Sequence, residues 1–291
     1  MAPFFFKCAL GLYLLGSLGY ILYIIFQKKP LARLSYGFLA LGFIAHSLSI
    51  GFWSIQNGYF PVSNLKESLS FFAWAIIGVY LLIQLRFNIL VLGSFLSPVA
   101  SVMMISSSFL PLQAEVVNPL IRNLWLMIHV GTIFIGNGIF AVAFLAGIMY
   151  LIQERQIKSK HFGPFYHRLP SLEVLDSLNY NCLILGFPLL TMGMLSGAIF
   201  AHYTLGYFWR WDPKEVWSLI TWLIYAILLH GRLTTGWRGR RSAMISIIGF
   251  TVLIFSFLGL NFLVKGYHSF SAFQVSSPEV WETKPKKTPQ N

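Results

Sequence analysis

Charged side chains are scarce in this sequence, because Asp, Glu, Lys and Arg together make up 10% of the 291 residues while apolar residues make up 56%. Soluble globular domains carry about 25% charged residues, so this balance excludes an ordinary soluble protein and favours one that lies in lipid. Acidic residues are the scarcer kind, nine against 21 basic ones, which gives a net charge of +12. The basic residues form short clusters between apolar runs, which indicates membrane topology rather than a nucleic-acid-binding surface.

Cysteine is almost absent. Cys8 and Cys182 fall near opposite ends of different predicted membrane spans, about 30 Å apart, which is too far for a disulfide. The sequence has no C-x-x-C pair either, so a thiol-redox function has little support.

Long soluble domains, internal repeats and low-complexity tracts are also missing, apart from a short Pro/Lys-rich tail. The sequence therefore predicts one all-α transmembrane domain over residues 1–275 and a disordered tail over residues 276–291. Any function must lie in the helices and their short loops.

Eight apolar segments are long enough to cross a bilayer as helices. The first is too long for a signal-peptide core and is followed by Lys28 and Lys29, so we expect it to remain as a transmembrane helix. The split between the third and fourth segments is marked only by Arg86, Phe87 and Asn88. The predicted spans are residues 8–26, 34–54, 68–85, 88–106, 123–152, 179–203, 213–231 and 242–264.

The basic residues predict the orientation of these spans. If both termini face outward, the inner loops hold twelve Lys and Arg residues and the outer segments before the tail hold five. The inner set is Lys28, Lys29, Arg33, Arg86, Arg155, Lys158, Lys160, Arg168, Arg232, Arg238, Arg240 and Arg241, and the outer set is Lys7, Lys66, Arg122, Arg210 and Lys214. Three lysines of the tail oppose this orientation, but the positive-inside rule gives late segments less weight.

Aromatic residues concentrate in the predicted outer loop between the sixth and seventh spans. Trp209, Trp211, Trp217 and Trp222 fall within fourteen residues. An interfacial aromatic belt would explain isolated residues such as Trp53, but it explains this density poorly. We call residues 205–217 the tryptophan loop.

The tryptophan loop also contains a helix start. Asp212, Pro213 and Glu215 have the spacing of an N-cap, a first helical residue and a capping-box partner, and Asn64 with Glu67 repeats it before the third span. Asp212 and Glu215 are therefore expected to be structural rather than catalytic. A helix start that faces outward also suits an anionic ligand.

Two stretches carry a resemblance to a known family. Residues 211–215, residues 217–225 and His230 form one, and residues 58–65 together with residues 67–68 and 71–74 form the other. They resemble the WWD haem-handling family and most closely its CcsA (ResC) branch, whereas the Pro-Lys-Glu continuation differs from the CcmC and CcmF branches. The likeness covers most of the chain, although Leu205 stands where the family usually has Trp.

The resemblance implies a function in c-type cytochrome assembly. It implies that the chain carries haem b across the membrane and supports its covalent attachment to apocytochromes at C-x-x-C-H motifs, together with a CcsB (ResB) partner. It implies a location in a bacterial inner membrane or a thylakoid membrane. The residues expected to contact haem in and after the tryptophan loop are Trp209, Trp211, Asp212, Trp217 and Trp222.

Histidine is the usual protein ligand of haem iron, and seven are present. His129 lies about 10 Å into the helix that follows Arg122, and His268 lies four residues beyond the eighth span, both on the predicted outer side. The resemblance points to the same two residues as axial ligands of an outward-facing haem.

The other five histidines are less clear. The resemblance makes His230 a ligand of a second haem inside the membrane, but its partner ligand is open: His46 would lie about 15 Å away along the membrane normal, so the CcsB-type protein is the alternative source. His202 is a weak ligand candidate beside the tryptophan loop. His161 and His167 lie in a basic inner loop and are expected to face solvent or lipid headgroups.

Two other classes of function remain open. A transporter of an amphipathic metabolite could use the histidines as proton relays. The predicted spans, however, contain no charged residues beyond Lys214 and Glu215 at the start of the seventh, and no repeated pair of broken helices. A purely structural assembly subunit would bind no chromophore. No general acid or nucleophile can be assigned, so whether the chain alone is an enzyme is open.

Overall fold

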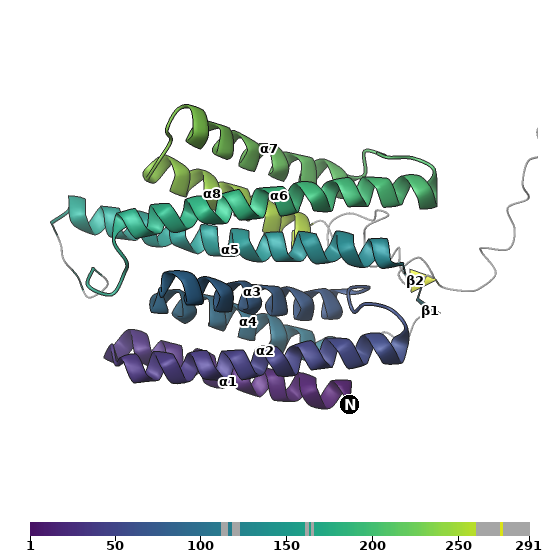
Figure 1. Cartoon of the computed structure of the whole chain (residues 1–291), viewed down its shortest axis with the longest axis horizontal. Coiled ribbons are helices and arrows are strands. Elements are labelled where there is room, and N and C mark those ends of the chain that lie inside the picture. The colour runs from purple at the N-terminus through teal and green to yellow at the C-terminus, as the bar shows by residue number, and fades with distance from the viewer. Residues whose placement is uncertain (112–115, 118–122, 161–162, 164–165, 260–273, 276–291) are drawn as a thin grey trace, which may run out of the picture.

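The computed structural model describes residues 1–111, 116–117, 123–160, 163, 166–259 and 274–275, and this part of the chain is built from helices (Figure 1). A π-helical turn, η2 (Phe255–Gly259), extends the last helix, and the two-residue strands β1 (Val116–Val117) and β2 (Gln274–Val275) pair antiparallel. The helices are α1 (Ala2–Phe26), α2 (Lys29–Asn57), α3 (Leu65–Phe87), α4 (Leu90–Phe109), α5 (Leu124–Lys158), α6 (Leu172–Leu205), α7 (Pro213–Thr234) and α8 (Arg240–Ile254).

Eight helices of the described part are long and apolar enough to cross a membrane, which confirms the predicted all-α fold with eight spans. Most predicted boundaries were too narrow, because polar residues near helix ends were assigned to loops. The largest error is in α6, which begins at Leu172 rather than at residue 179 and so brings Asp176 into the helix. Residues 260–264 of the last predicted span and the predicted tail from residue 276 lie outside the described residues.

The turn between α3 and α4 is short and depends on one residue. Asn88 follows the last residue of α3 in the left-handed conformation, with φ 51°, and its backbone N–H donates to Gln84 O. Asn tolerates this conformation better than most residues and so ends helices well. The predicted break between the third and fourth spans is therefore confirmed.

The helices form two halves, α1–α4 and α5–α8, which lie side by side with their axes nearly aligned (Figure 1). Within the second half α5 packs along α6 and α8, and α7 packs on α8 and α6. The halves meet mainly between α3 and α5. An aromatic cluster joins them, in which Phe72 of α3, Phe134 of α5 and Phe257 of η2 make edge-to-face contacts with ring centroids 5.5–5.7 Å apart.

Polar side chains inside the first half bond to one another across helices. His46 is fully buried, and its Nδ1 lies 3.4 Å from Tyr13 Oη while its Nε2 lies 2.9 Å from Ser70 Oγ. Ser17 and Ser101 share a 2.7 Å hydrogen bond between α1 and α4. Both ring nitrogens of His46 are therefore used within the bundle, and this residue links helices instead of facing His230.

The chain's N-terminus, the tryptophan loop and the β1–β2 pair lie at one end of the bundle, and the α5–α6 and α7–α8 connections lie at the other (Figure 1). Successive connections between helices therefore lie at alternating ends of the bundle, as the distribution of basic residues predicted. The predicted assignment of the tryptophan-loop end to the outer side of the membrane rests on those residues.

We expect cysteine labelling to establish this orientation. In a chain whose two native cysteines are replaced by Ala, Arg210→Cys should react with an impermeant maleimide added outside intact cells or vesicles, because this exposed residue lies in the tryptophan loop. Lys158→Cys, at the other end, should react only after the membrane is permeabilised. The opposite pattern of labelling would reverse the orientation.

Candidate functional site

The tryptophan loop is held by the capping box at the start of α7, as predicted. Asp212 Oδ1 accepts a 2.9 Å hydrogen bond from Lys214 N–H, and Glu215 Oε2 accepts from Asp212 N–H at 3.3 Å. Glu215 Oε2 also accepts a 2.8 Å bond from Arg210 N–H. One carboxylate therefore fixes the backbone on both sides of Trp211.

Trp211 is exposed and its backbone is strained. Its φ is +62°, which is unfavourable for a residue with a bulky side chain, and 72% of the residue is accessible. Trp209 is less exposed than Trp211, and its ring meets that of Trp211 edge to face with centroids 6.0 Å apart. Its buried Nε1–H has no hydrogen-bond partner among the described residues. The loop thus presents one indole outward and keeps an unsatisfied donor beneath it.

The rest of the loop is ordered by ring contacts. The ring of His202, near the end of α6, stacks on Phe208 with centroids 4.0 Å apart and planes 4° apart. The Arg210 guanidinium lies 4.1 Å from the centre of the Tyr207 ring. His202 therefore positions the loop, which is a simpler account of this residue than iron ligation. Its ring partners Tyr203 and Phe208 are themselves exposed.

Trp217 and Trp222 point into the helical bundle. Trp217 meets Phe255 edge to face at 4.8 Å, and Trp222 donates from Nε1 to Thr191 Oγ1 at 2.9 Å while its ring packs on Phe187. These contacts dock α7 on η2 and α6. Both residues are half-buried, and their expected contact with haem stays a prediction.

His129 lies in α5 near the same end, half-buried against α6. Its Nδ1 lies 2.6 Å from the carbonyl oxygen of Gly193. The other residue predicted to bind the same iron, His268, lies outside the described residues, as does His161. The predicted pairing of His129 with His268 therefore stays a prediction.

His230 lies near the other end of α7 and is exposed. The buried positions on this helix are Thr221, Tyr225, Leu228 and Gly231, and at 100° per residue His230 points away from the face that carries Tyr225 and Leu228. Its side chain consequently faces out of the bundle, toward lipid or another protein.

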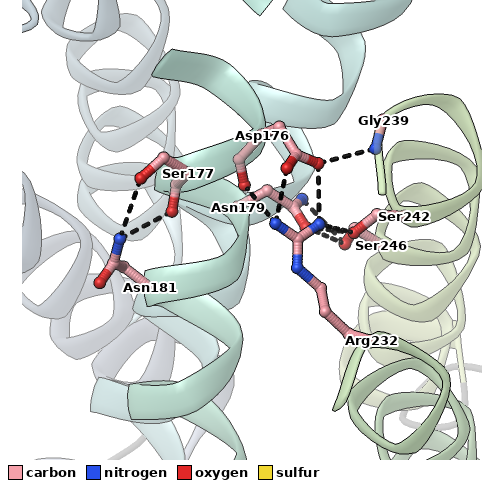
Figure 2. Close-up of polar contacts among 8 residues, drawn as sticks. All are labelled: Asp176, Ser177, Asn179, Asn181, Arg232, Gly239, Ser242 and Ser246. Carbon is pink, nitrogen blue, oxygen red and sulfur yellow. Dashed lines mark hydrogen bonds and ion pairs between the residues drawn. The ribbon is translucent and has the colours of Figure 1, made fainter. Parts of the chain in front are cut away.

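Arg232, two residues further, points into the bundle and forms a paired-charge network (Figure 2). Its Nη1 and Nη2 donate to the two carboxylate oxygens of Asp176, each at 2.7 Å, and the Arg232 side chain is only 6% exposed. Gly239 N–H donates to the same carboxylate at 2.8 Å, and Ser242 accepts from Arg232 and donates to Asn179. The network joins α6, α7 and the start of α8, and sequence reasoning missed it because Asp176 had been placed in a loop.

The second stretch that carried the resemblance forms another capped helix start. Asn64 Oδ1 accepts from Glu67 N–H at 2.9 Å, and Glu67 Oε2 accepts from the N–H and the hydroxyl of Ser63. Tyr59 donates to Glu67 Oε1, and burial together with the nearby Glu67 charge raises the pKa of Tyr59, so this hydroxyl stays protonated. These hydrogen bonds fix the loop before α3.

Across the described ranges, no group of three or more His, Cys, Asp or Glu side chains could hold a metal ion. A haem iron needs only one or two axial ligands from protein, because the porphyrin supplies the others. Single histidines such as His129 and His230 are sufficient for that chemistry.

Comparisons with known proteins agree with one another. The model of the family described as cytochrome C assembly protein matches residues 62–268. The chain is 36% identical to the cytochrome c biogenesis protein CcsA of Guillardia theta over 278 residues, which cover 88% of this chain and 92% of that protein. It is 31% identical to the CcsA of Synechocystis sp., with 89% and 94% covered.

A solved structure shares the fold. The cytochrome c haem lyase CcmF superposes with a TM-score of 0.61 at 16% sequence identity. The match covers 89% of this chain but 46% of that one, so the chain corresponds to less than half of the lyase's length.

The Asp176–Arg232 pair should be important for stability. Asp176→Ala leaves the buried guanidinium without its counter-charge, and we expect a loss of about 3 kcal/mol, the low end for a buried pair because the Asp176 side chain keeps 18% exposure. Lys158→Ala, which removes the 65% exposed partner of Glu154, is the control and should cost about 0.5 kcal/mol or less. Thermal unfolding of both variants in the same detergent measures the difference, and equal stabilities would contradict a structural role for the network.

Proposed function

Because the chain belongs to the cytochrome c assembly protein family, as a CcsA-type member, we propose that this integral membrane protein carries haem to the tryptophan loop and holds it there for covalent attachment to apocytochromes c. In this proposal residues 1–275 act as one haem-handling domain in a bacterial inner membrane or a thylakoid membrane. The attachment site on the apocytochrome is a C-x-x-C-H motif, and a CcsB-type protein is the membrane partner. The proposed ligand is haem b.

The observation that carries the proposal is the exposure of Trp211. Leaving an indole 72% accessible in a strained backbone conformation has a free-energy cost, and the capping box maintains that arrangement. Phe208, in the same loop, and Tyr203, near the end of α6, add further exposed aromatic surface. A flat apolar porphyrin would cover such a surface and remove it from water.

The polar groups around this surface also fit haem. The cap already uses the N–H groups at the start of α7, but the positive dipole end of this helix and the basic residues Arg210 and Lys214 suit a propionate. The buried Trp209 Nε1–H would gain an acceptor there. His129 approaches from α5 as one axial ligand, and His268 is the proposed second ligand. The haem supplies the iron and vinyl groups, while the protein supplies binding and orientation.

His230 is proposed to bind haem before it reaches the tryptophan loop. Its outward orientation on α7 excludes a ligand pair made with the buried His46, whose ring nitrogens already bond to Tyr13 and Ser70. The second ligand would therefore come from the CcsB-type partner. A haem at this position would lie at the boundary between the two proteins.

The described contacts do not support the alternative of a metabolite transporter. Its proton relay would need histidines in contact with one another or with acidic groups, whereas both ring nitrogens of the buried His46 bond to hydroxyls. The absorption spectrum of the purified protein separates the two proposals, since only haem gives an intense Soret band.

Substitution of Trp209 or Trp211 should reduce haem binding more than substitution of the helix cap Asp212. Loss of the Asp212 cap costs about 1 kcal/mol of helix stability, whereas loss of an aromatic ring that covers a porphyrin forfeits about 1.5 to 3 kcal/mol. Trp209→Ala and Trp211→Ala should therefore lower co-purified haem more than Asp212→Ala, at equal membrane abundance. Haem content equal to wild type in both tryptophan variants would remove the loop from the proposed site.

The axial ligands can be tested by chemical rescue. His129→Gly and His268→Gly each remove an imidazole and leave a hole of its size, so cytochrome maturation should fall and added imidazole should restore part of it. His202→Gly is the control, since His202 stacks on Phe208 and its loss should not be rescued by imidazole. Normal maturation in both ligand variants without imidazole would refute the assignment.

A further inference from the structure

The imidazole of His129 packs against the backbone of α6 at Gly197, one turn after Gly193. A Cβ built on Gly197 would lie 2.5 Å from Cε1 and 2.7 Å from Nδ1 of His129, and one built on Gly193 would lie 2.5 Å from Cδ1 of Ile133. Small residues four apart let two membrane helices approach closely. At this place the approach brings the His129 ring against the backbone of the neighbouring helix.

The same backbone makes a directional contact with the ring. The carbonyl oxygen of Gly193 lies 2.6 Å from His129 Nδ1 and also accepts a 2.9 Å hydrogen bond from Ser196 Oγ. A carbonyl oxygen can only accept, so Nδ1 must carry the hydrogen. In a neutral imidazole the lone pair is then on Nε2, which is the nitrogen available in principle to a metal.

We propose that Gly193 and Gly197 are the positioning residues of the axial ligand His129: the Gly193 carbonyl fixes the tautomer, and the bare backbone at Gly197 fixes the plane of the ring. The inference rests on the proposed function for its meaning, because it names what orients the haem ligand of the same site. Ligating histidines commonly donate their second N–H to a backbone carbonyl or carboxylate, which sets the ring orientation and raises the basicity of the ligating nitrogen.

Gly197→Ala is the informative substitution, because its methyl group would meet the ring and nothing else is changed. Gly186→Ala is the matched control on the same helix. A Cβ there would meet the ring of Phe140 at 2.8 Å, against 2.5 Å for the His129 ring at Gly197, so it also disturbs the α5–α6 contact but without touching His129. A general weakening of helix packing should affect both variants, whereas a positioning role affects only the first.

The tautomer can be measured without any haem. In the full chain, labelled with ¹⁵N-histidine and expressed under haem depletion, His129 should show a protonated Nδ1 and an unprotonated Nε2, assigned by its absence in His129→Gln. A free neutral imidazole in water favours the opposite tautomer, so the expected signal is distinctive. Gly197→Ala should shift His129 toward the Nε2–H form, and Gly186→Ala should leave it unchanged.

Haem binding then tests whether Gly193 and Gly197 position His129 for the haem. Loss of a partner that orients a ligand weakens metal binding about ten- to a hundredfold, which we expect for Gly197→Ala together with a loss of the low-spin spectrum. In a His129→Gly background the same substitution should cause no further loss, because there is no ring left to displace. Gly186→Ala should bind haem like wild type in both backgrounds.

The outcomes separate this inference from the proposed function. An Nε2–H tautomer at His129 in the wild-type chain, or equal haem affinity in Gly197→Ala and wild type, would overturn the positioning role and leave the haem site in place. A loss in the His129→Gly background as large as that in the wild-type background would show that Gly197 acts on packing and not through the His129 ring. The predicted tautomer in a chain that binds no haem would support the positioning of His129 by Gly193 and Gly197 and reject the proposed function.

Discussion

The structure depends on one constraint: inside a bilayer no water is available, so each polar group must find its partner within the protein or pay a high free-energy cost. This constraint sorts the histidines. His46 satisfies both ring nitrogens with hydroxyls from α1 and α3 and becomes part of the packing. His129 satisfies one nitrogen with a backbone carbonyl, and His230 faces out of the bundle. Residues of the same type therefore differ in their bonding partners and in their exposure.

The features that sequence reasoning predicted correctly depend on local information. Eight spans follow from apolar runs, whose length alone decides whether a helix can cross the membrane. The caps at Asn64 and Asp212 follow from spacings of three residues, and Asn88 marks a turn by its own conformational preference. Each of these signals is complete within a few residues, and distant parts of the chain do not change it.

The features that it missed join residues far apart in the chain. Asp176 and Arg232 are 56 positions apart, and nothing near either residue indicates the other. The contacts of Trp217 with Phe255 and of Trp222 with Thr191 also join distant parts of the chain, and the tryptophan-rich pattern did not indicate them. They depend on the rotation of α7. Both faces of such helices are apolar, so hydrophobic periodicity does not define the rotation. The packing of neighbouring helices defines it.

The Asp176–Arg232 pair also constrains how the chain can enter the membrane. During synthesis α6 emerges before α7, and each carries one charge that has its partner only in the other. A single such charge disfavours insertion by about 2.5 to 3.5 kcal/mol at the centre of a helix and by less near its end, where these two residues lie. Insertion of the two helices as a hairpin avoids that barrier. The translocation machinery would therefore have to retain α6 until the 22 residues of α7 have been made.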